Sequence, residues 1–267
     1  MIWRRTILCT LPLILLFCLQ ALASPPSPIG PGPPASNGPR NPPVLPEPRI
    51  PAGADPGGIA IALLGYGADY TQPDIAARLA RDGEGVPIAW DFADNDNRPF
   101  AKLGRGTADA RTLISAAAKN PGGEVRIILV KQATADPVAL GRMVAFSART
   151  PARIIVWPDA NPKRPDWPIL TVAAKRFPHI LFVIPRVDSI PRGTALPELI
   201  NLVVLSSTNL GSTNSTTTAA GGVGMGTQRQ AALLAALLAA AKAGALLAAS
   251  PNLGFGELKR KLLARTQ

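Results

Sequence analysis

The sequence predicts an α/β domain in which a mostly parallel central sheet is covered by helices, giving three layers. Two observations carry this prediction. Beyond Gly57, unbroken apolar runs of strand length alternate with segments of helical length, and no repeat of fixed period is present. Parallel strands are buried on both faces, so they consist of nearly continuous apolar residues, and the connection between two of them is usually a helix.

The elements follow in chain order. The apolar runs predict strands at residues 59–64, 125–130, 154–157, 180–184 and 202–205. The segments between and after them predict helices at residues 107–119, 137–149, 168–176, 227–249 and 255–264. The folded domain is therefore expected to span residues 58–267.

The helix predicted at residues 227–249 consists almost entirely of alanine and leucine. Both a membrane span and a helix wrapped by the rest of the domain fit such a run. Lys242 and Gly244 interrupt it, and alanine is only weakly lipophilic. We therefore expect a buried helix of the domain.

The first 23 residues have the features of a cleavable secretory signal. Arg4 and Arg5 precede an apolar run over residues 6–19, and a small-x-small pattern ends at Ala23, as a signal peptidase requires. An uncleaved anchor is the alternative, but Pro12 interrupts the run, which is short for a bilayer span of about 20 residues. We expect cleavage after Ala23 and a secreted or periplasmic protein.

Residues 24–57 are predicted to form a proline-rich disordered tether. From Ser24 to Pro51 there are 12 prolines in 28 residues, mixed with glycine, serine and asparagine. Such a stretch forms neither helices nor sheet ladders and samples extended polyproline conformations. The segment is therefore expected to act as a spacer between the signal and the domain.

The cysteine content and the net charge limit which covalent bonds, metal ligands and partners the mature chain can have. Its two cysteines, Cys9 and Cys18, lie inside the signal, so the mature chain has no disulfide and no thiolate metal ligand. Loss of Arg4 and Arg5 lowers the formal net charge from +11 to +9. A basic surface favours anionic partners such as envelope lipids, acidic glycans or acidic proteins. Its Lys and Arg residues are scattered, so solubility alone is the alternative, and no nucleic-acid partner is expected.

Three segments carry a family resemblance. Residues 61–75 read IALLGYGADYTQPDI, residues 90–100 read WDFADNDNRPF, and residues 104–111 read GRGTADAR. They resemble the subtilisin-like serine peptidases, the subtilases. In that family a strand ends in Asp-[Thr/Ser]-Gly, an aspartate and a His-Pro-[Asp/Glu]-[Leu/Ile] turn follow, and Gly-His-Gly-Thr-His opens a helix. The matching framework residues here are Gly67, Asp69, Pro73, Asp74, Ile75 and Gly106.

Looser matches continue downstream in the same order. Residues 153–157, 180–185 and 199–206 resemble three family strands, and GGVGMG from Gly221 resembles the Gly-Thr-Ser-Met-Ala segment that opens the central helix. The resemblance spans Gly58 to the C-terminus. It implies a subtilisin-like three-layer fold and, for a typical member, a serine endopeptidase activity.

The same alignment implies a degenerate catalytic triad. It places Gly65 at the aspartate position, Arg105 at the histidine position and Gly224 at the serine position. Peptide hydrolysis in this family needs a hydroxyl nucleophile, an imidazole base and a carboxylate that orients the imidazole. Glycine has no side chain and a guanidinium is not deprotonated in proteins. We therefore expect a pseudopeptidase that serves as a binding or structural partner. The alternative is a serine-type endopeptidase with an unconventional site.

Other residues offer little replacement chemistry. The single histidine, His179, precedes a predicted strand where the family has no catalytic group. Ser212 and Ser215 lie in the loop before the long alanine-rich helix, with no base beside them. The acidic run at residues 91–97 lacks the glycine and terminal glutamate of a calcium loop and is expected to form a turn with side-chain caps. No cofactor or metal is expected.

Arg105 is the candidate binding residue. Amide groups in the first turn of a helix favour anions, and an arginine beside them adds donors for a carboxylate or phosphate. The cleft is therefore expected to bind an acidic ligand, such as a carboxylate of a partner protein in the cell envelope. The alternative is that Arg105 pairs with a neighbour such as Asp69 or Asp109. A third hypothesis is an envelope module whose basic face makes peripheral contact with an anionic membrane.

Overall fold

The computed structural model describes residues 47–102, 104–120, 122, 124–132, 136–160, 166–186, 198–206 and 225–264. The predicted signal, most of the predicted tether, Ser212, Ser215 and Gly224 lie outside the described residues. Pro46 to Gln267 form one unit, to which the description below refers.

The centre of this unit is a parallel sheet of six strands in the order β2-β3-β1-β4-β5-β6. The strands are β1 (Ile59–Gly65), β2 (Trp90–Asp91), β3 (Val125–Lys131), β4 (Ile154–Val156), β5 (Leu181–Pro185) and β6 (Leu202–Leu205). Ile59 pairs with Val125 of β3, and Ile61 pairs with Ile154 of β4, so β1 lies at the middle of the sheet. The predicted mostly parallel α/β fold is confirmed.

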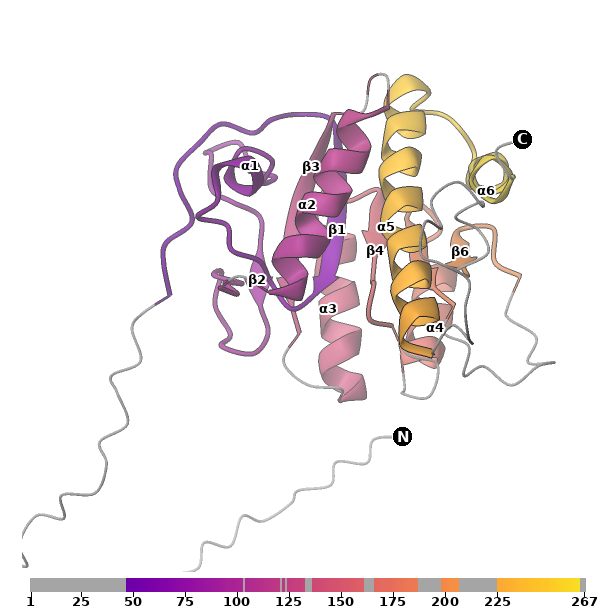
Figure 1. Ribbon diagram of the computed structural model, residues 1–267, viewed down its shortest axis with the longest axis horizontal. Coiled ribbons are helices and arrows are strands. Elements are labelled where there is room, and N and C mark those ends of the chain that lie inside the picture. The colour runs from indigo at the N-terminus through magenta and orange to yellow at the C-terminus, as the bar shows by residue number, and fades with distance from the viewer. Residues whose placement is uncertain are drawn as a thin grey trace, which may run out of the picture. The chain divides into compact units, whose positions relative to one another are not determined.

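Helices cover both faces of the sheet (Figure 1). They are α1 (Pro73–Ala76), α2 (Arg105–Ala118), α3 (Pro137–Arg149), α4 (Asp166–Arg176), α5 (Met225–Ala249) and α6 (Phe255–Leu263). Ile61 and Leu63 of β1 belong to the core beneath α2 and α5, whereas Ala62 and Leu64 belong to the core beneath α3 and α4. Alternate side chains of a strand point to opposite faces, so one apolar run supplies both cores.

The alanine-rich helix α5 lies against the middle of the sheet. Residues Gln228–Ala249 are long and apolar enough to cross a membrane, but Ala236, Ala240 and Leu247 are completely buried in the domain. A Cβ atom at Gly244 would lie 2.9 Å from Val125 Cγ1 of β3, so the glycine allows the close approach of helix and sheet. The prediction of a buried helix is confirmed.

The strands and long helices begin and end close to the predicted residues, but two short elements were not predicted. Strand β2 has 2 residues, and α1 has 4. Neither is long enough to show a period of hydrophobicity.

The last part of the predicted tether packs on the domain. The Tyr70 hydroxyl donates to the Pro48 carbonyl at 2.6 Å, and Arg81 Nη2 donates to the Pro51 carbonyl at 2.7 Å. Arg126 Nη1 lies 2.7 Å from Asp55 Oδ2. Proline-rich backbone lacks donors but keeps its carbonyl acceptors, which these side chains use. The folded unit therefore begins near Pro46 rather than at Gly58.

Candidate functional site

The loop after β1 and the first turn of α2 are in direct backbone contact. A Cβ atom at Gly106 would overlap the carbonyl oxygen of Gly67, which has a φ of +73°. The Oγ1 atom of Thr107, a buried residue, accepts a hydrogen bond from the Asp69 amide at 2.9 Å. Glycine at both contact positions therefore lets the helix start against the end of the central strand.

Asp69 is used locally. Its carboxylate accepts from the Thr71 hydroxyl at 2.5 Å, the Thr71 amide at 3.1 Å and Gln72 Nε2 at 2.9 Å. The hydrogen bond from the Thr71 hydroxyl is the main cause that lowers the pKa of Asp69, and burial opposes it. Asp69 thus caps a turn. One expected alternative was that Asp69 pairs with Arg105, and the described contacts include no such ion pair.

Arg105 instead belongs to a polar cluster at the carboxyl edge of the sheet. Its Nη1 atom lies 3.3 Å from Asp159 Oδ1, and its Nε atom lies 4.0 Å from Asp109 Oδ2. Arg229 Nη2, on α5, lies 2.6 Å from the same Asp159 oxygen. The Tyr66 hydroxyl donates to Asp159 Oδ2 at 2.7 Å. These five residues are called the Asp159 cluster below.

The topology explains why these residues meet. Tyr66 follows the carboxyl end of β1, and Asp159 follows the carboxyl end of the neighbouring β4. Arg105 and Arg229 lie near the N-terminal ends of α2 and α5, which return to the same edge. After β1 the chain continues to β2 and β3 on one side of the sheet, whereas after the neighbouring β4 it continues to β5 and β6 on the other side. This is the switch point at which open α/β sheets bind ligands.

Burial sets the charge state of the cluster. Asp109 and Asp159 are each only 8% exposed. Burial raises the pKa of Asp109 to about 6; the Asp159 charge adds to the rise, and Arg105 opposes it. Burial and the hydrogen bond to Asp159 also raise the pKa of Tyr66. Two guanidinium groups thus share one buried carboxylate, beside a carboxyl group that titrates near pH 6.

Comparison with known proteins bears on the fold. No protein-family model matches the chain, and no curated protein matches its sequence. Among solved structures, the chain is similar to a cold-adapted subtilisin-like serine proteinase, with a TM-score of 0.52 and 14% sequence identity. The match covers 79% of this chain and 83% of that chain. The fold is subtilisin-like. At this identity the likeness concerns the fold alone.

Two of the three positions that the sequence alignment assigns to the catalytic triad can be located in the structure. Gly65 is the last residue of β1, and Arg105 is the first residue of α2. Gly224 lies outside the described residues. His179, the single histidine of the chain, contacts Phe177 at a centroid distance of 6.3 Å. It precedes the amino end of β5, which is the edge opposite to the Asp159 cluster, so no imidazole can reach the cluster.

Three members of the cluster were not predicted as site residues: Tyr66, Asp159 and Arg229. Tyr66 and Asp159 lie just beyond the ends of two predicted strands, and the carboxyl ends of parallel strands share one edge. That signal was present in the sequence. Arg229 has no comparable signal, because its role depends on where α5 packs.

The acidic loop forms the expected turn with side-chain caps. Asp91 Oδ1 accepts from the Ala93 amide at 2.7 Å and the Asp94 amide at 3.2 Å. Carboxylate oxygens of Glu47, Asp91 and Asp96 lie within 4.8 Å of one another, a spacing that a metal ion could use.

A lysine already supplies the positive charge at this loop. Lys131 Nζ lies 2.6 Å from Asp91, 3.2 Å from Asp94 and 3.3 Å from Glu47. Burial alone would lower the pKa of Lys131, but the hydrogen bonds to Asp91 and Asp94 raise it. The loop therefore holds an internal ammonium group, which also attaches the N-terminal residues of the domain.

Proposed function

We propose that the protein is an exported subtilisin-like pseudopeptidase that acts as a binding or structural partner in the cell envelope. The observation that carries the proposal is the ion pair between Arg105 and Asp159. Arg105 opens α2, where the family resemblance aligns the catalytic histidine. A guanidinium keeps its proton at every physiological pH, so it cannot accept one from a nucleophile.

The aligned neighbours support the same reading. Gly65 ends β1 where the family carries the carboxylate that orients the histidine, and a glycine offers no such group. Gly224 is aligned with the nucleophile by sequence alone. In subtilisin, loss of the serine or the histidine alone lowers kcat by about 2 × 10⁶. Peptide hydrolysis by the family mechanism would therefore be negligible.

The Asp159 cluster supports a role in binding anions. Each guanidinium has five N–H donors. Arg105 and Arg229 each donate a hydrogen bond to Asp159, so most of their donors are left for a ligand. The guanidinium groups of both arginines contact the one Asp159 carboxylate, while Asp109 is protonated in part near pH 6. The remaining donors suit a carboxylate of a partner protein. Such a carboxylate would lie beside Asp159, within the positive field of both arginines.

Covalent labelling tests the loss of activity. The mature protein, purified from the exported fraction, is incubated with a serine-reactive fluorophosphonate and, separately, with casein; an active subtilisin-like proteinase is the positive control. We expect neither a labelled serine nor casein fragments above a buffer control. Casein turnover that the phosphonate abolishes would overturn the proposal. The variants Ser212→Ala and Ser215→Ala would then identify the serine responsible.

A further inference from the structure

The outer surfaces of α2 and α5 form a groove with a volume of about 590 Å³. On the α5 side it is lined by Leu234 and Leu238, which are 39% and 38% exposed. These two leucines are four residues apart and therefore lie on one stripe of the helix. On the α2 side the lining includes three small residues, Thr112, Ser115 and Ala116. The groove thus has an apolar wall opposite a wall that allows close approach.

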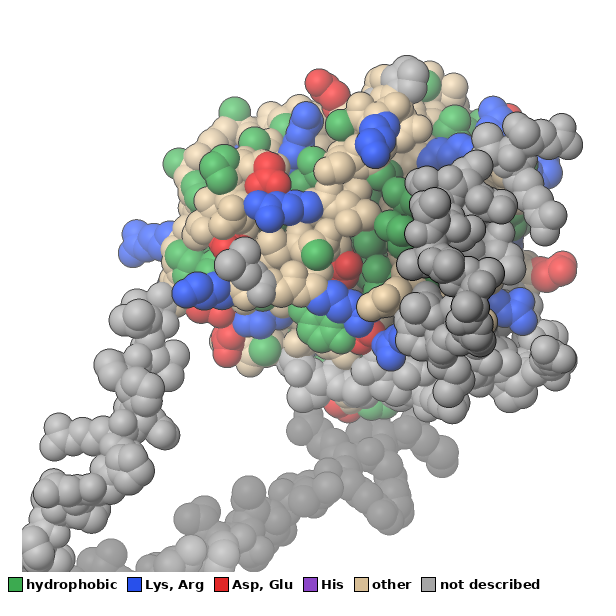
Figure 2. All heavy atoms as spheres, viewed as in Figure 1, with side chains coloured by type: hydrophobic (Ala, Val, Ile, Leu, Met, Phe, Trp, Pro, Cys, Tyr) green, Lys and Arg blue, Asp and Glu red, His purple; other side chains and the backbone are tan. Residues whose placement is uncertain are grey.

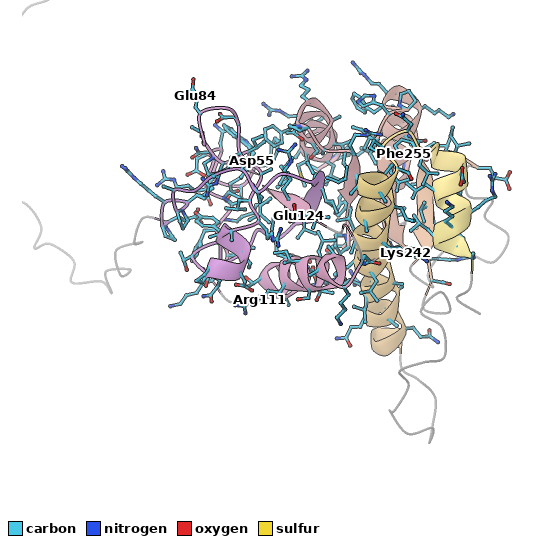
Figure 3. All side chains as sticks on the ribbon, turned by 90° about the horizontal axis from the view of Figure 1, so that it is seen from above. Asp55, Glu84, Arg111, Glu124, Lys242 and Phe255 are labelled. Atoms are coloured by element: carbon cyan, nitrogen blue, oxygen red, sulfur yellow. The ribbon has the colours of Figure 1, made fainter. Side chains whose placement is uncertain are left out.

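All the described charged residues that line the groove are positively charged. Arg111, Lys119 and Lys242 line it, and the described lining residues include no Asp or Glu. Figure 3 labels Arg111 on α2 and Lys242 on α5. In Figure 2, Lys and Arg side chains border apolar side chains on this face of the molecule. Arg111 is neutralised by Asp74 at 2.8 Å, so Lys119 and Lys242 carry the uncompensated charge.

Neither lysine is held by a carboxylate in the described structure. Lys119 is exposed, and its ammonium group makes no hydrogen bond or ion pair with any residue that the structure describes. Lys242 Nζ lies 3.4 Å from the carbonyl oxygen of Lys261. An incoming acidic group would therefore meet two available ammonium groups beside an apolar stripe.

We propose that this groove binds an acidic amphipathic helix of a partner protein. Apolar residues of that helix, spaced three and four apart, pack on Leu234 and Leu238, and its Asp or Glu side chains contact Lys119 and Lys242. Amphipathic helices commonly bind in such grooves, and small residues on one wall let a helix backbone come close. The docked helix would add a third helix beside α2 and α5.

Charge and shape argue against other occupants. Residues 1–46 and 207–224 of this chain contain no Asp or Glu, so they cannot supply the complementary charge. A second copy placed by two-fold symmetry would bring the same lysines together. A bilayer surface is flat, whereas this surface is concave. The proposal goes beyond the pseudopeptidase assignment, because the groove begins about 9 Å along α2 from Arg105 and does not depend on the loss of catalysis.

Site-specific photocrosslinking tests the proposal in the exported protein. A photoreactive amino acid replaces Ser115 in the groove or, as a control, Val172, which is 64% exposed on α4 on the opposite face. Crosslinked peptides are then identified by mass spectrometry. We expect a light-dependent protein adduct at position 115 and none at 172. The crosslinked peptide should carry Asp or Glu beside apolar residues spaced three or four apart.

A second test reverses the charge of the two lysines in the groove. The double variant Lys119→Glu, Lys242→Glu should give about tenfold less adduct, because like charges then face each other. Lys175→Glu, an exposed site on α4, should leave the adduct unchanged. A lipid adduct, a self-adduct, an adduct without acidic residues or no adduct would overturn the proposal. So would an adduct that survives charge reversal. Circular dichroism confirms that each variant is folded, and phosphonate labelling separately reports on the pseudopeptidase assignment.

Discussion

Asp159 and Arg229 are 70 residues apart in the chain, yet Arg229 Nη2 lies 2.6 Å from Asp159 Oδ1. Arg105 Nη1 contacts the same oxygen at 3.3 Å. One buried carboxylate after β4 thus joins the starts of α2 and α5, at the edge where the family resemblance places its catalytic groups.

Removal of the Asp159 charge should destabilise the domain. In Asp159→Asn two guanidinium groups would face each other around an amide, so we expect a loss of about 1–3 kcal/mol in the free energy of unfolding, measured by urea denaturation. The control is Glu257→Gln, which breaks the exposed pair with Lys261 and should shift the midpoint little. An unchanged midpoint in Asp159→Asn would show that the cluster contributes no stability.

Asp109 should make stability depend on pH between about 4 and 6. Its pKa is about 6 in the folded protein against an ordinary 3.8, so the folded state binds the proton more tightly. This contribution to stability is complete below pH 3.8 and is lost as the pH rises to about 6.

The variant Asp109→Asn tests this dependence. It should be more stable than the wild type at pH 7 by about 1–3 kcal/mol, and the gain should shrink towards pH 4. Urea midpoints measured from pH 4 to pH 7 report it. Glu84→Gln, at an exposed site labelled in Figure 3, should leave the pH profile unchanged. A pH-independent difference between Asp109→Asn and the wild type would contradict the raised pKa.

Gly244→Leu should destabilise the domain through overpacking. Its Cβ would lie 2.9 Å from Val125 Cγ1 and 3.3 Å from Ile61 Cδ1, so the core must shift at a cost of about 1–3 kcal/mol. The same change at Gly141 of α3, where a Cβ meets nothing within 4 Å, should be neutral or stabilising because leucine favours helices. Thermal unfolding of both variants measures the contrast. Equal melting temperatures would mean that α5 does not pack closely on the sheet.

Arg105→Ala should weaken binding of an acidic partner. A charge-assisted hydrogen bond contributes about 1.5–3 kcal/mol, so affinity should fall about tenfold or more. The measurement is a titration with the partner recovered by crosslinking from the native envelope. Arg142→Ala, at an exposed position on α3, is the matched control. If Arg105→Ala is folded and binds as tightly as the wild type, Arg105 is purely structural.

The exported protein should begin at Ser24. This expectation rests on Arg4, Arg5 and the small-x-small pattern that ends at Ala23. N-terminal sequencing of the exported fraction measures it, and Ala23→Arg should cause the precursor to accumulate. Intact Met1 in the membrane fraction would instead identify the segment as an anchor.

Much of the fold could be predicted because its signals are local. The buried strands read as apolar runs, and the starts of β1, β3, β4 and β6 were placed correctly. Strand β2 escaped prediction because its pairing with β3 depends on a neighbour from a distant part of the chain. The packing of Pro48 and Pro51 on the domain was missed for the same reason: proline content predicts extended backbone but not which donors will reach its carbonyls.

For the candidate site too, the sequence predicted some features and only the tertiary structure decided others. From the residues alone it followed that Arg105 cannot act as a base, that Gly65 offers no carboxylate, and that the single histidine is His179. These conclusions depend on the chemistry of single side chains. The contact of Arg105 with Asp109 was among the alternatives expected from the sequence, and the structure contains it. The closer partner, Asp159, did not follow, because Asp159 is 54 residues away and reaches Arg105 only through the order of the strands and the return of α2 to the carboxyl edge. Periodicity and propensity describe neighbours along the chain, whereas a buried ion pair is selected by the packing of whole elements.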